Sequence, residues 1–331
     1  MENNTSRDVK KVEISYKTII FTAVFVASLW FLYFIRDIVL QLFAALLLMA
    51  ILNPIVNKLS KIKIPKALSI FVSYILIFGL FGFAIGILLP PLVEQTTNLA
   101  NNLPKYFQDS GISKYANGDV LKEIVSQLGT VPSQVIKAGF SFFTNILNVL
   151  TVLIFAFYLL LIRDKFEKSL EFMFGKTKGE DVSKLINQLE VRLGGWARGQ
   201  LLLMLLIGIS SYIGFIILGI PYALPLALLA GIFEIVPYLG PVVASIPAII
   251  LGFSISPFVG GATIGLAVLI QQLENYLFVP KIMEKSTGVS PIITLLSLAI
   301  GAKLAGITGM VISIPIVIII QTLLQNRFQE K

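Results

Sequence analysis

The chain has 331 residues, of which 56% are hydrophobic and only 13% carry a charge, and its mean hydropathy is +0.88. These values lie far beyond those of an ordinary soluble domain and indicate a polytopic membrane protein. The formal net charge is +8, but the basic residues lie in short loops beside apolar stretches, where retention in the cytoplasm explains them without a nucleic-acid partner.

The residue types that are missing exclude several kinds of chemistry. The sequence contains no cysteine and no histidine, so disulfides, zinc sites built on these residues and Ser-His or Cys-His nucleophiles cannot form. It also has no Gly-x-x-x-x-Gly-Lys-Ser/Thr loop to bind nucleotide phosphates. We therefore expect no enzyme activity, no cofactor and no metal site, and any transport must draw on a gradient or on another subunit.

The apolar stretches predict an all-α transmembrane bundle with about eight membrane segments, since about 20 apolar residues cross the hydrocarbon core. An opening hairpin consists of Thr18 to Ile35 and the shorter Ile38 to Leu52, and two further spans are Ala67 to Val93 and Phe140 to Ile162. Lysines gather between the second and third spans, whereas the loop after the third has no net charge. This asymmetry places the lysine-rich side and the N-terminus in the cytoplasm.

The pattern divides the chain into five parts. Residues 1–93 hold the tail and three spans, and 140–162 form the fourth span. Between them, segment 94–139 has leucines at helical spacing, which predicts extracytoplasmic amphipathic helices that cap a pathway, lie on the membrane or contact a neighbouring subunit. Residues 163–198 are mixed in charge with one apolar stripe, which indicates a cytoplasmic helical segment. Residues 199–331 form the expected transport core.

Broken helices characterise this transport core. The uncharged run from Ile235 to Leu273 contains Pro237 to Pro241, where two short helices would meet in a hairpin because proline removes a donor and glycine allows the turn. From Pro291 to Gln325 a glycine-rich centre carries a lone Lys303 and predicts a second broken hairpin, related to the first unless the similarity is due to chance. Irregular backbone at membrane depth is tolerated where it lines a cavity or is buried in protein.

Two lone carboxylates, Glu234 and Glu274, flank the uncharged run. A carboxylate in hydrocarbon costs roughly 2.5–3.5 kcal/mol on insertion scales, so it persists mainly where it faces a cavity, a partner or a permeant. Gln271, Glu274 and Asn275 are spaced at i, i+3 and i+4 and therefore share one helix face. The patch either serves transport or holds helices together by hydrogen bonds. A salt bridge to Lys281 or Lys303 would remove Glu274 from proton exchange.

Three ordered motifs resemble those of the autoinducer-2 exporter family of bacterial permeases. Gly195 to Gln200 is similar to the family's Gly-aromatic-x-Arg-Gly-Gln element, and Glu234 to Pro241 is similar to its Glu-x-Ile/Val-Pro-Tyr-x-Gly-Pro signature. Gln271 to Pro280 resembles the third motif, although Glu284 stands where relatives often have glycine. The resemblance implies a homo-oligomeric permease, such as a pentamer, in the cytoplasmic membrane with both termini in the cytoplasm.

The resemblance leaves the permeant open among three hypotheses. The leading one is export of a small polar solute, like autoinducer-2, by gradient-driven alternating access, with Glu234 or Glu274 carrying the driving proton. The alternative is Na⁺(Li⁺)/H⁺ antiport, in which the same carboxylates bind the cation together with backbone carbonyls freed at the break. The third is a non-transporting membrane scaffold or assembly factor, whose Gly-x-x-x-Gly pairs only pack helices.

The candidate pathway combines the broken hairpin, the polar helix face and the end of the cytoplasmic segment. Arg198 either gates the pathway or extends to the membrane interface. The expected partners are the lipid bilayer, a small polar solute or a monovalent cation and proton, and further copies of the chain. The candidate site residues are Glu234, Pro237, Tyr238, Gly240, Pro241, Gln271, Glu274, Asn275, Arg198 and Gln200.

Overall fold

The computed structural model describes residues 16–109, 146–283 and 290–329, and every regular element in these ranges is a helix. The predicted all-α fold is therefore confirmed. The chain divides into two compact units, residues 1–44 and 45–331. Helix α3 (Lys66–Asp109) continues past the predicted third span, while residues 110–139 of the predicted extracytoplasmic segment, and Glu284, lie outside the described residues.

The first unit contains α1 (Tyr16–Phe34) and the beginning of α2 (Arg36–Lys61). The amide of Ile35 donates to the carbonyl of Phe31, and the amide of Val39 donates to that of Ile35. Because these bonds continue the helical pattern across Ile35, the chain does not make the hairpin turn that the sequence suggested. The side chains of α1 are largely exposed and apolar, as expected of a helix that faces lipid.

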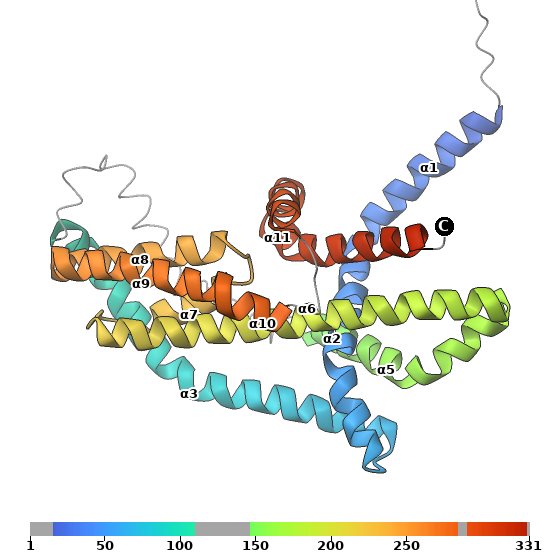
Figure 1. Cartoon of the computed structure of the whole chain (residues 1–331), viewed down its shortest axis with the longest axis horizontal. Helices are drawn as coiled ribbons and strands as arrows, with labels where there is room; N and C mark the ends of the chain where they lie inside the picture. Colours follow the sequence, from blue (N-terminus) through green and yellow to red (C-terminus); the bar gives the residue numbers. More distant parts are fainter. Residues whose placement is uncertain (1–15, 110–145, 284–289, 330–331) are drawn as a thin grey trace, which may run out of the picture. The chain divides into compact units, whose positions relative to one another are not determined.

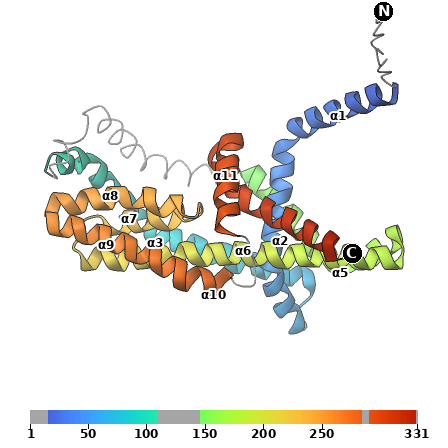
Figure 2. The ribbon, with the colours of Figure 1, turned by 45° about the horizontal axis from the view of Figure 1, so that its top comes forward.

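Helix α6 organises the second unit because it contacts α5, α7, α9, α10 and α11. Figures 1 and 2 show α7, α8 and α9 running alongside it. After α3, the elements are α5 (Ile146–Phe174), α6 (Lys176–Ile217), α7 (Ala223–Phe233), α8 (Leu239–Ile255), α9 (Pro257–Leu273), the π-helix η2 (Glu274–Phe278), α10 (Val279–Met283) and α11 (Pro291–Gln329).

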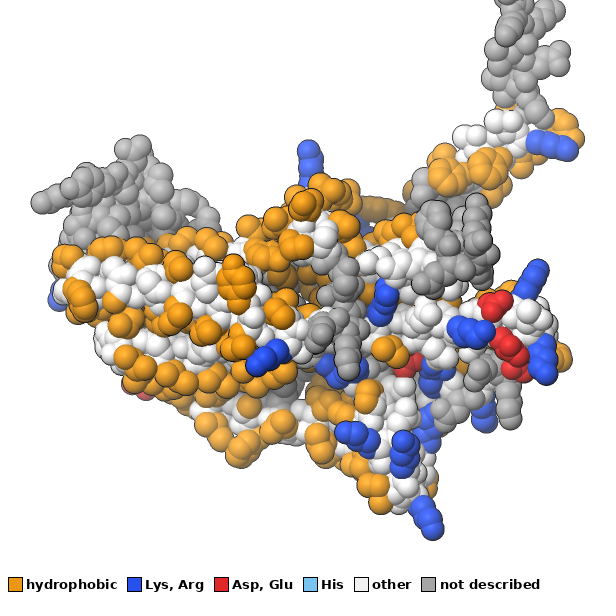
Figure 3. Space-filling view, in the orientation of Figure 1, with side chains coloured by type: hydrophobic (Ala, Val, Ile, Leu, Met, Phe, Trp, Pro, Cys, Tyr) orange, Lys and Arg blue, Asp and Glu red, His pale blue; other side chains and the backbone are white. Residues whose placement is uncertain are grey.

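Six helices of the described chain are long and apolar enough to cross a membrane, and three shorter apolar helices accompany them. This agrees with the predicted multi-pass bundle. Hydrophobic side chains cover much of α8 and α9, whereas Lys and Arg side chains gather near the α2–α3 and α5–α6 turns (Figure 3). The six candidate spans are Arg36–Lys61, Lys66–Leu88, Ile146–Arg163, Lys176–Ile217, Pro257–Met283 and Pro291–Asn326.

The segment 163–198 is helical, as predicted, and consists of the end of α5 and the first half of α6. With 42 residues, α6 is about 63 Å long at 1.5 Å per residue, roughly twice the thickness of the hydrocarbon core. The first half of α6 carries a polar cluster in which Glu190 pairs with Arg163 of α5 and accepts a hydrogen bond from Asn53 of α2. This cluster ties α2, α5 and α6 together.

The glycine-rich centre of α11 forms the second predicted break. Ala305 has φ −145° and ψ 24°, and Gly306 has φ 59° and ψ −140°, so α11 is two helices joined at these residues. The two halves approach closely beside the break, because a Cβ on Gly309 would lie 2.0 Å from the carbonyl oxygen of Gly301. No side chain fits at that position unless the backbone moves.

We predict that Gly309→Ala lowers the free energy of unfolding by about 1–3 kcal/mol, because the added methyl group overpacks the contact between the halves of α11. Gly265→Ala is the matched control, since nothing lies within 4 Å of its Cβ position and alanine favours a helix. The measurement is thermal unfolding of both purified variants in detergent. Equal melting temperatures for the two variants would contradict the close approach.

Candidate functional site

The break between α7 and α8 lies at the predicted Pro237 to Pro241 segment. Residues 234–238 form turns, and Tyr238 has φ 65° and ψ −47°, a conformation that costs free energy for a residue other than glycine. A Cβ on Gly240 would lie 1.8 Å from the carbonyl oxygen of Phe233. The chain therefore needs glycine at this position to bring the start of α8 against the end of α7.

Glu234 lies at the end of α7 and is only 1% exposed. Its backbone carbonyl accepts a hydrogen bond of 2.6 Å from the side-chain amide of Gln200 on α6. Its carboxyl oxygen Oε2 is buried and has no hydrogen-bond partner among the described residues. Gln200 thus satisfies the irregular backbone, while the carboxyl group remains available to a ligand.

Glu274 is the first residue of the π-helical turn that follows α9, and it is 2% exposed. The side-chain amide of Gln271 donates a hydrogen bond of 2.9 Å to its Oε2 atom. π-Helical turns are rare and are frequent at functional sites. Gln271 and Glu274 therefore form the contact that their spacing predicted, with the acid turned into the protein.

Both carboxyl groups line one cavity of about 90 Å³, which we call the carboxylate cavity. Neither forms a salt bridge within the described residues, and no Lys or Arg lines the cavity. Lys281 and Lys303 are exposed. The lining residues come from α6, the α7–α8 break and the elements from η2 to α11: Trp196, Gln200, Leu203, Glu234, Pro237, Tyr238, Glu274, Val279, Met283, Thr294 and Ile314.

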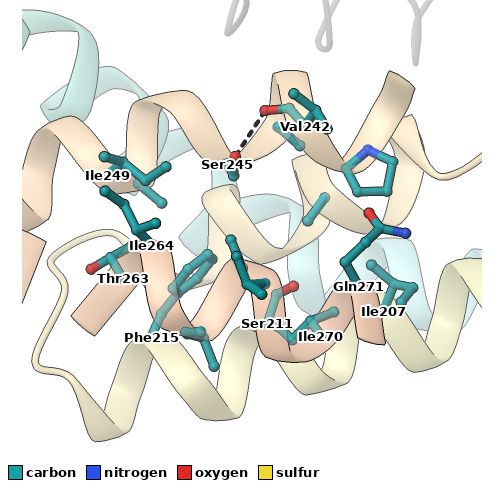
Figure 4. Close-up of a pocket in the computed structure, with 17 residues that line it drawn as sticks. Ile207, Ser211, Phe215, Val242, Ser245, Ile249, Thr263, Ile264, Ile270 and Gln271 are labelled. Atoms are coloured by element: carbon teal, nitrogen blue, oxygen red, sulfur yellow. Dashed lines mark hydrogen bonds between the residues drawn. The ribbon is translucent and has the colours of Figure 1, made fainter. Parts of the chain in front are cut away.

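A second cavity of about 250 Å³, which we call the apolar cavity, lies between α6, α7, α8 and α9 (Figure 4). Pro241 and Gln271 belong to its walls, which are otherwise mainly aliphatic. The hydroxyl groups of Ser245 and Thr263 each donate at 2.8 Å to a carbonyl of their own helix. These two polar side chains consequently offer no hydrogen to a bound molecule.

The two cavities follow one face of α6, because the α6 residues that line them recur every three or four positions. The segment that carries them is about 28 Å long at 1.5 Å per residue, close to the thickness of the hydrocarbon core. The cavities therefore lie in succession along α6. The residues are Trp196, Gln200 and Leu203 in the carboxylate cavity, followed by Ile207, Ser211 and Phe215 in the apolar cavity.

Arg198 lines neither cavity, and its contact differs from both roles that the sequence suggested. Its Nη1 atom donates a hydrogen bond of 2.6 Å to the carbonyl oxygen of Ala50 in α2. The residue four positions later is Pro54, which has no amide hydrogen to bond that carbonyl. Arg198 therefore replaces the backbone donor that Pro54 removes, and it joins α6 to α2.

The remaining predicted residues separate into two groups. Glu234, Glu274, Gln200, Pro237 and Tyr238 meet at the carboxylate cavity, and Pro241 and Gln271 line the apolar cavity. Asn275 is exposed and lines neither, and it points about 100° away from Glu274, as successive helical residues do. Gly240 lines neither cavity, but its missing side chain allows α8 to begin against the carbonyl of Phe233.

Sequence reasoning did not identify the apolar members of the carboxylate cavity. Trp196 could have been found, because it lies four residues before Gln200 and therefore on the same face of α6. Met283, Thr294 and Ile314 come from later elements, and no local pattern marks them as neighbours of the carboxyl groups. No sequence pattern indicated the apolar cavity, because its aliphatic lining residues do not differ from those of any other membrane helix.

Cavities at broken helices within a bundle of membrane helices are typical of membrane transporters. The chain belongs to the AI-2E transporter family, because the model of that family, described as "AI-2E family transporter", matches residues 19–329. The protein is thus a multi-pass membrane transporter.

Two relatives come from Bacillus subtilis (strain 168). The chain is 32% identical over 332 residues to the one named "Putative transport protein YueF", with 93% of this chain and 89% of the relative covered. It is 26% identical over 305 residues to "Putative transport protein YrrI", with 88% and 86% covered. A third, "Putative transport protein MT0215" from Mycobacterium tuberculosis (strain CDC 1551 / Oshkosh), is 23% identical, with 92% and 86% covered.

We predict that Arg198→Met lowers the free energy of unfolding by about 1–3 kcal/mol, because it leaves the buried carbonyl of Ala50 without a donor. Pro54→Ala restores an amide hydrogen at that place, so the double variant should regain most of the loss. The measurement is a double-mutant cycle by chemical unfolding in detergent, with an expected coupling of about 1 kcal/mol or more. Additive effects would show that Arg198 acts elsewhere.

Proposed function

We propose that the protein is a gradient-driven secondary transporter that exports a small polar solute by alternating access, with Glu234 and Glu274 carrying protons. One observation carries this proposal: two almost fully buried carboxyl groups line one cavity at a helix break, without a basic residue among its described walls. A pure packing role would leave the cost of burying these groups uncompensated.

The coupling follows from the electrostatics of the carboxylate cavity. Two like charges in a water-poor site repel, so bound protons or a bound cation must neutralise them. Tyr238 is the only other titratable group among the described lining residues. A permeant that competes with protons for Glu234 and Glu274 therefore exchanges with them, which links the movement of the permeant to the proton gradient.

Polar groups near the carboxyl pair support recognition of a hydroxyl-bearing solute of the autoinducer-2 kind. Gln200, Tyr238 and Gln271 supply amide and hydroxyl groups beside the two acids. The α7–α8 break and the π-helical turn are discontinuities of the kind that form transporter binding sites. We take the direction of transport and the type of solute in this proposal from the name of the family.

We also infer the orientation and the assembly. The lysine-rich α2–α3 turn and the α5–α6 turn face the cytoplasm by the excess of positive charge in cytoplasmic loops. The basic residues Arg7, Lys10 and Lys11 of the N-terminal tail favour the same side by that rule, without a hairpin of α1 and α2. The protein functions as a homo-oligomer, such as a pentamer, in the cytoplasmic membrane. Cross-linking of the membrane-embedded protein and labelling of cysteines introduced at Lys58 or Lys178 test these two points.

Na⁺(Li⁺)/H⁺ antiport is the second candidate, and the size of the carboxylate cavity favours it. A cavity of about 90 Å³ that is lined by two carboxyl groups is small and polar, which suits a monovalent cation with part of its hydration shell. In this mechanism the carboxyl oxygens of Glu234 and Glu274 bind the cation directly. The scaffold hypothesis has less support, because neither acid has a salt-bridge partner among the described residues.

We predict that Glu234→Gln and Glu274→Gln each abolish coupled proton movement, because glutamine cannot exchange a proton at the site. The measurement uses purified protein in liposomes with a trapped pH dye, to which Na⁺, Li⁺, K⁺ or autoinducer-2 is added. Glu94→Gln is the control, since Glu94 is an exposed acid on α3.

A proton signal with Na⁺ or Li⁺ that both substitutions remove identifies the antiporter, and a signal with autoinducer-2 alone identifies solute export. Signals of parental size in both variants would refute a role of these acids in coupling.

A further inference from the structure

A small polar solute does not explain the apolar cavity. Its volume is about 250 Å³, and residues such as Ile207, Phe215 and Ala248 form its walls. The hydroxyl hydrogens of Ser245 and Thr263 are used within their own helices. A strongly hydrated molecule would lose its water here and gain few hydrogen bonds in return. The cavity is suited to an apolar group.

The rim of the apolar cavity connects it with the hydrocarbon layer. Val242 of α8 and Ile264 and Val268 of α9 line the cavity and are 60%, 43% and 56% exposed. These apolar side chains lie on helices whose outer surface is mainly hydrophobic (Figure 3), so the surrounding phase is lipid. Molecules that partition into the bilayer can therefore reach the cavity from the side.

Ser211, Ser245, Thr263 and Gln271 are the polar side chains of the apolar cavity, and Gln271 is the one that also contacts a buried acid. Gln271 lines this cavity, and its amide group donates to Glu274, which lines the carboxylate cavity. The Oε1 atom of Gln271 is an acceptor for a donor group that arrives from the apolar side. Figure 4 shows Gln271 at one end of the group of lining side chains. One side chain thus joins the aliphatic walls to the buried acid pair.

We propose that the apolar cavity binds the apolar body of a small amphiphilic organic cation whose ammonium group is held at Gln271 and Glu274. This inference rests on the proton-coupled transport of the proposed function, and it assigns an organic cation as the substrate in place of the hydroxyl-bearing solute. An apolar cavity of about 150 Å³ in another protein binds benzene, so a volume of about 250 Å³ accommodates a phenyl ring with a short linker. The molecule is a compact primary amine.

A cation fits the site better than a neutral amphiphile or a lipid acyl chain. The Oε2 atom of Glu234 is buried without a partner, and neither acid has a salt bridge among the described residues. Trp196 and Tyr238 line the same cavity as the acids, and aromatic faces attract ammonium groups. A neutral occupant gains no electrostatic attraction from the acids, whereas an ammonium ion pairs with the carboxylate that remains when it displaces a proton.

The test measures binding of three probes to the purified full-length protein in detergent by isothermal titration calorimetry. The probes are 2-phenylethylammonium, its neutral counterpart 2-phenylethanol, and methylammonium. We expect 2-phenylethylammonium to bind at least tenfold more tightly than either of the others, since each buried methylene strengthens binding about fourfold and only the ammonium group finds the acids. Equal affinities of the amine and the alcohol would overturn the proposal, because the cavity would then accept any apolar molecule.

Two substitutions that fill the apolar cavity from different helices locate the binding site. Ala267→Leu on α9 and Ser245→Leu on α8 both add volume to its walls, and each should weaken binding of 2-phenylethylammonium at least tenfold. Gly265→Leu is the matched control on α9, because nothing lies within 4 Å of its Cβ position, and it should bind the probe as the parent does. Melting temperatures close to that of the parent confirm that each variant is folded.

The outcomes separate this inference from the proposed function. If the cavity-filling variants bind 2-phenylethylammonium like the parent, the substrate class is wrong, while proton coupling in liposomes can still be observed with other permeants. If the parent protein moves no protons with any cation or solute, the proposed function itself fails. Binding of the amine that persists at parental strength in Glu274→Gln would also overturn the assignment of its ammonium group.

Discussion

The absence of water from the hydrocarbon layer governs this structure, because every backbone carbonyl there must find a donor within the protein. Two carbonyls lose their usual donors, that of Ala50 because Pro54 follows it and that of Glu234 at the α7–α8 break. Arg198 and Gln200, two residues apart on α6, supply the replacements. The irregular backbone that forms the cavities therefore depends on a single regular helix.

Glutamates in the interior of the second unit have two different environments. Glu190 pairs with Arg163 and accepts from Asn53, so it contributes to the attachment of α2 and α5 to α6. Glu234 and Glu274 have no such partner among the described residues and line a cavity. A buried charge with its counter-ion can be structural, whereas an acid that faces a cavity without one has a cost that binding can offset.

The sequence predicted those features that follow from the free-energy cost of a residue type in its local stretch of chain. Prolines and glycine at Pro237 to Pro241 require a break, and acids in an apolar run require a cavity or a partner, so the helical hairpin and the meeting of Glu234 with Glu274 could be anticipated. The contact of Arg198 with Ala50 could not, because it joins residues 148 positions apart. The exposure of Asn275 was missed because a helix face wide enough for Gln271, Glu274 and Asn275 need not be buried over its whole width. The apolar cavity depended on how aliphatic residues fail to fill space, which no motif encodes.

Arg198 and Gln200 point about 200° apart around α6, since each residue of a helix turns by about 100°. One therefore reaches α2 while the other reaches the start of the α7–α8 turn. Rotation of α6 about its axis, or sliding by one helical turn, would strip donors from two buried carbonyls at the same moment. In the proposed alternating access we therefore expect α6 to keep its place against α2 and the α7–α8 turn, and the movement to occur in the segments from α9 to α11.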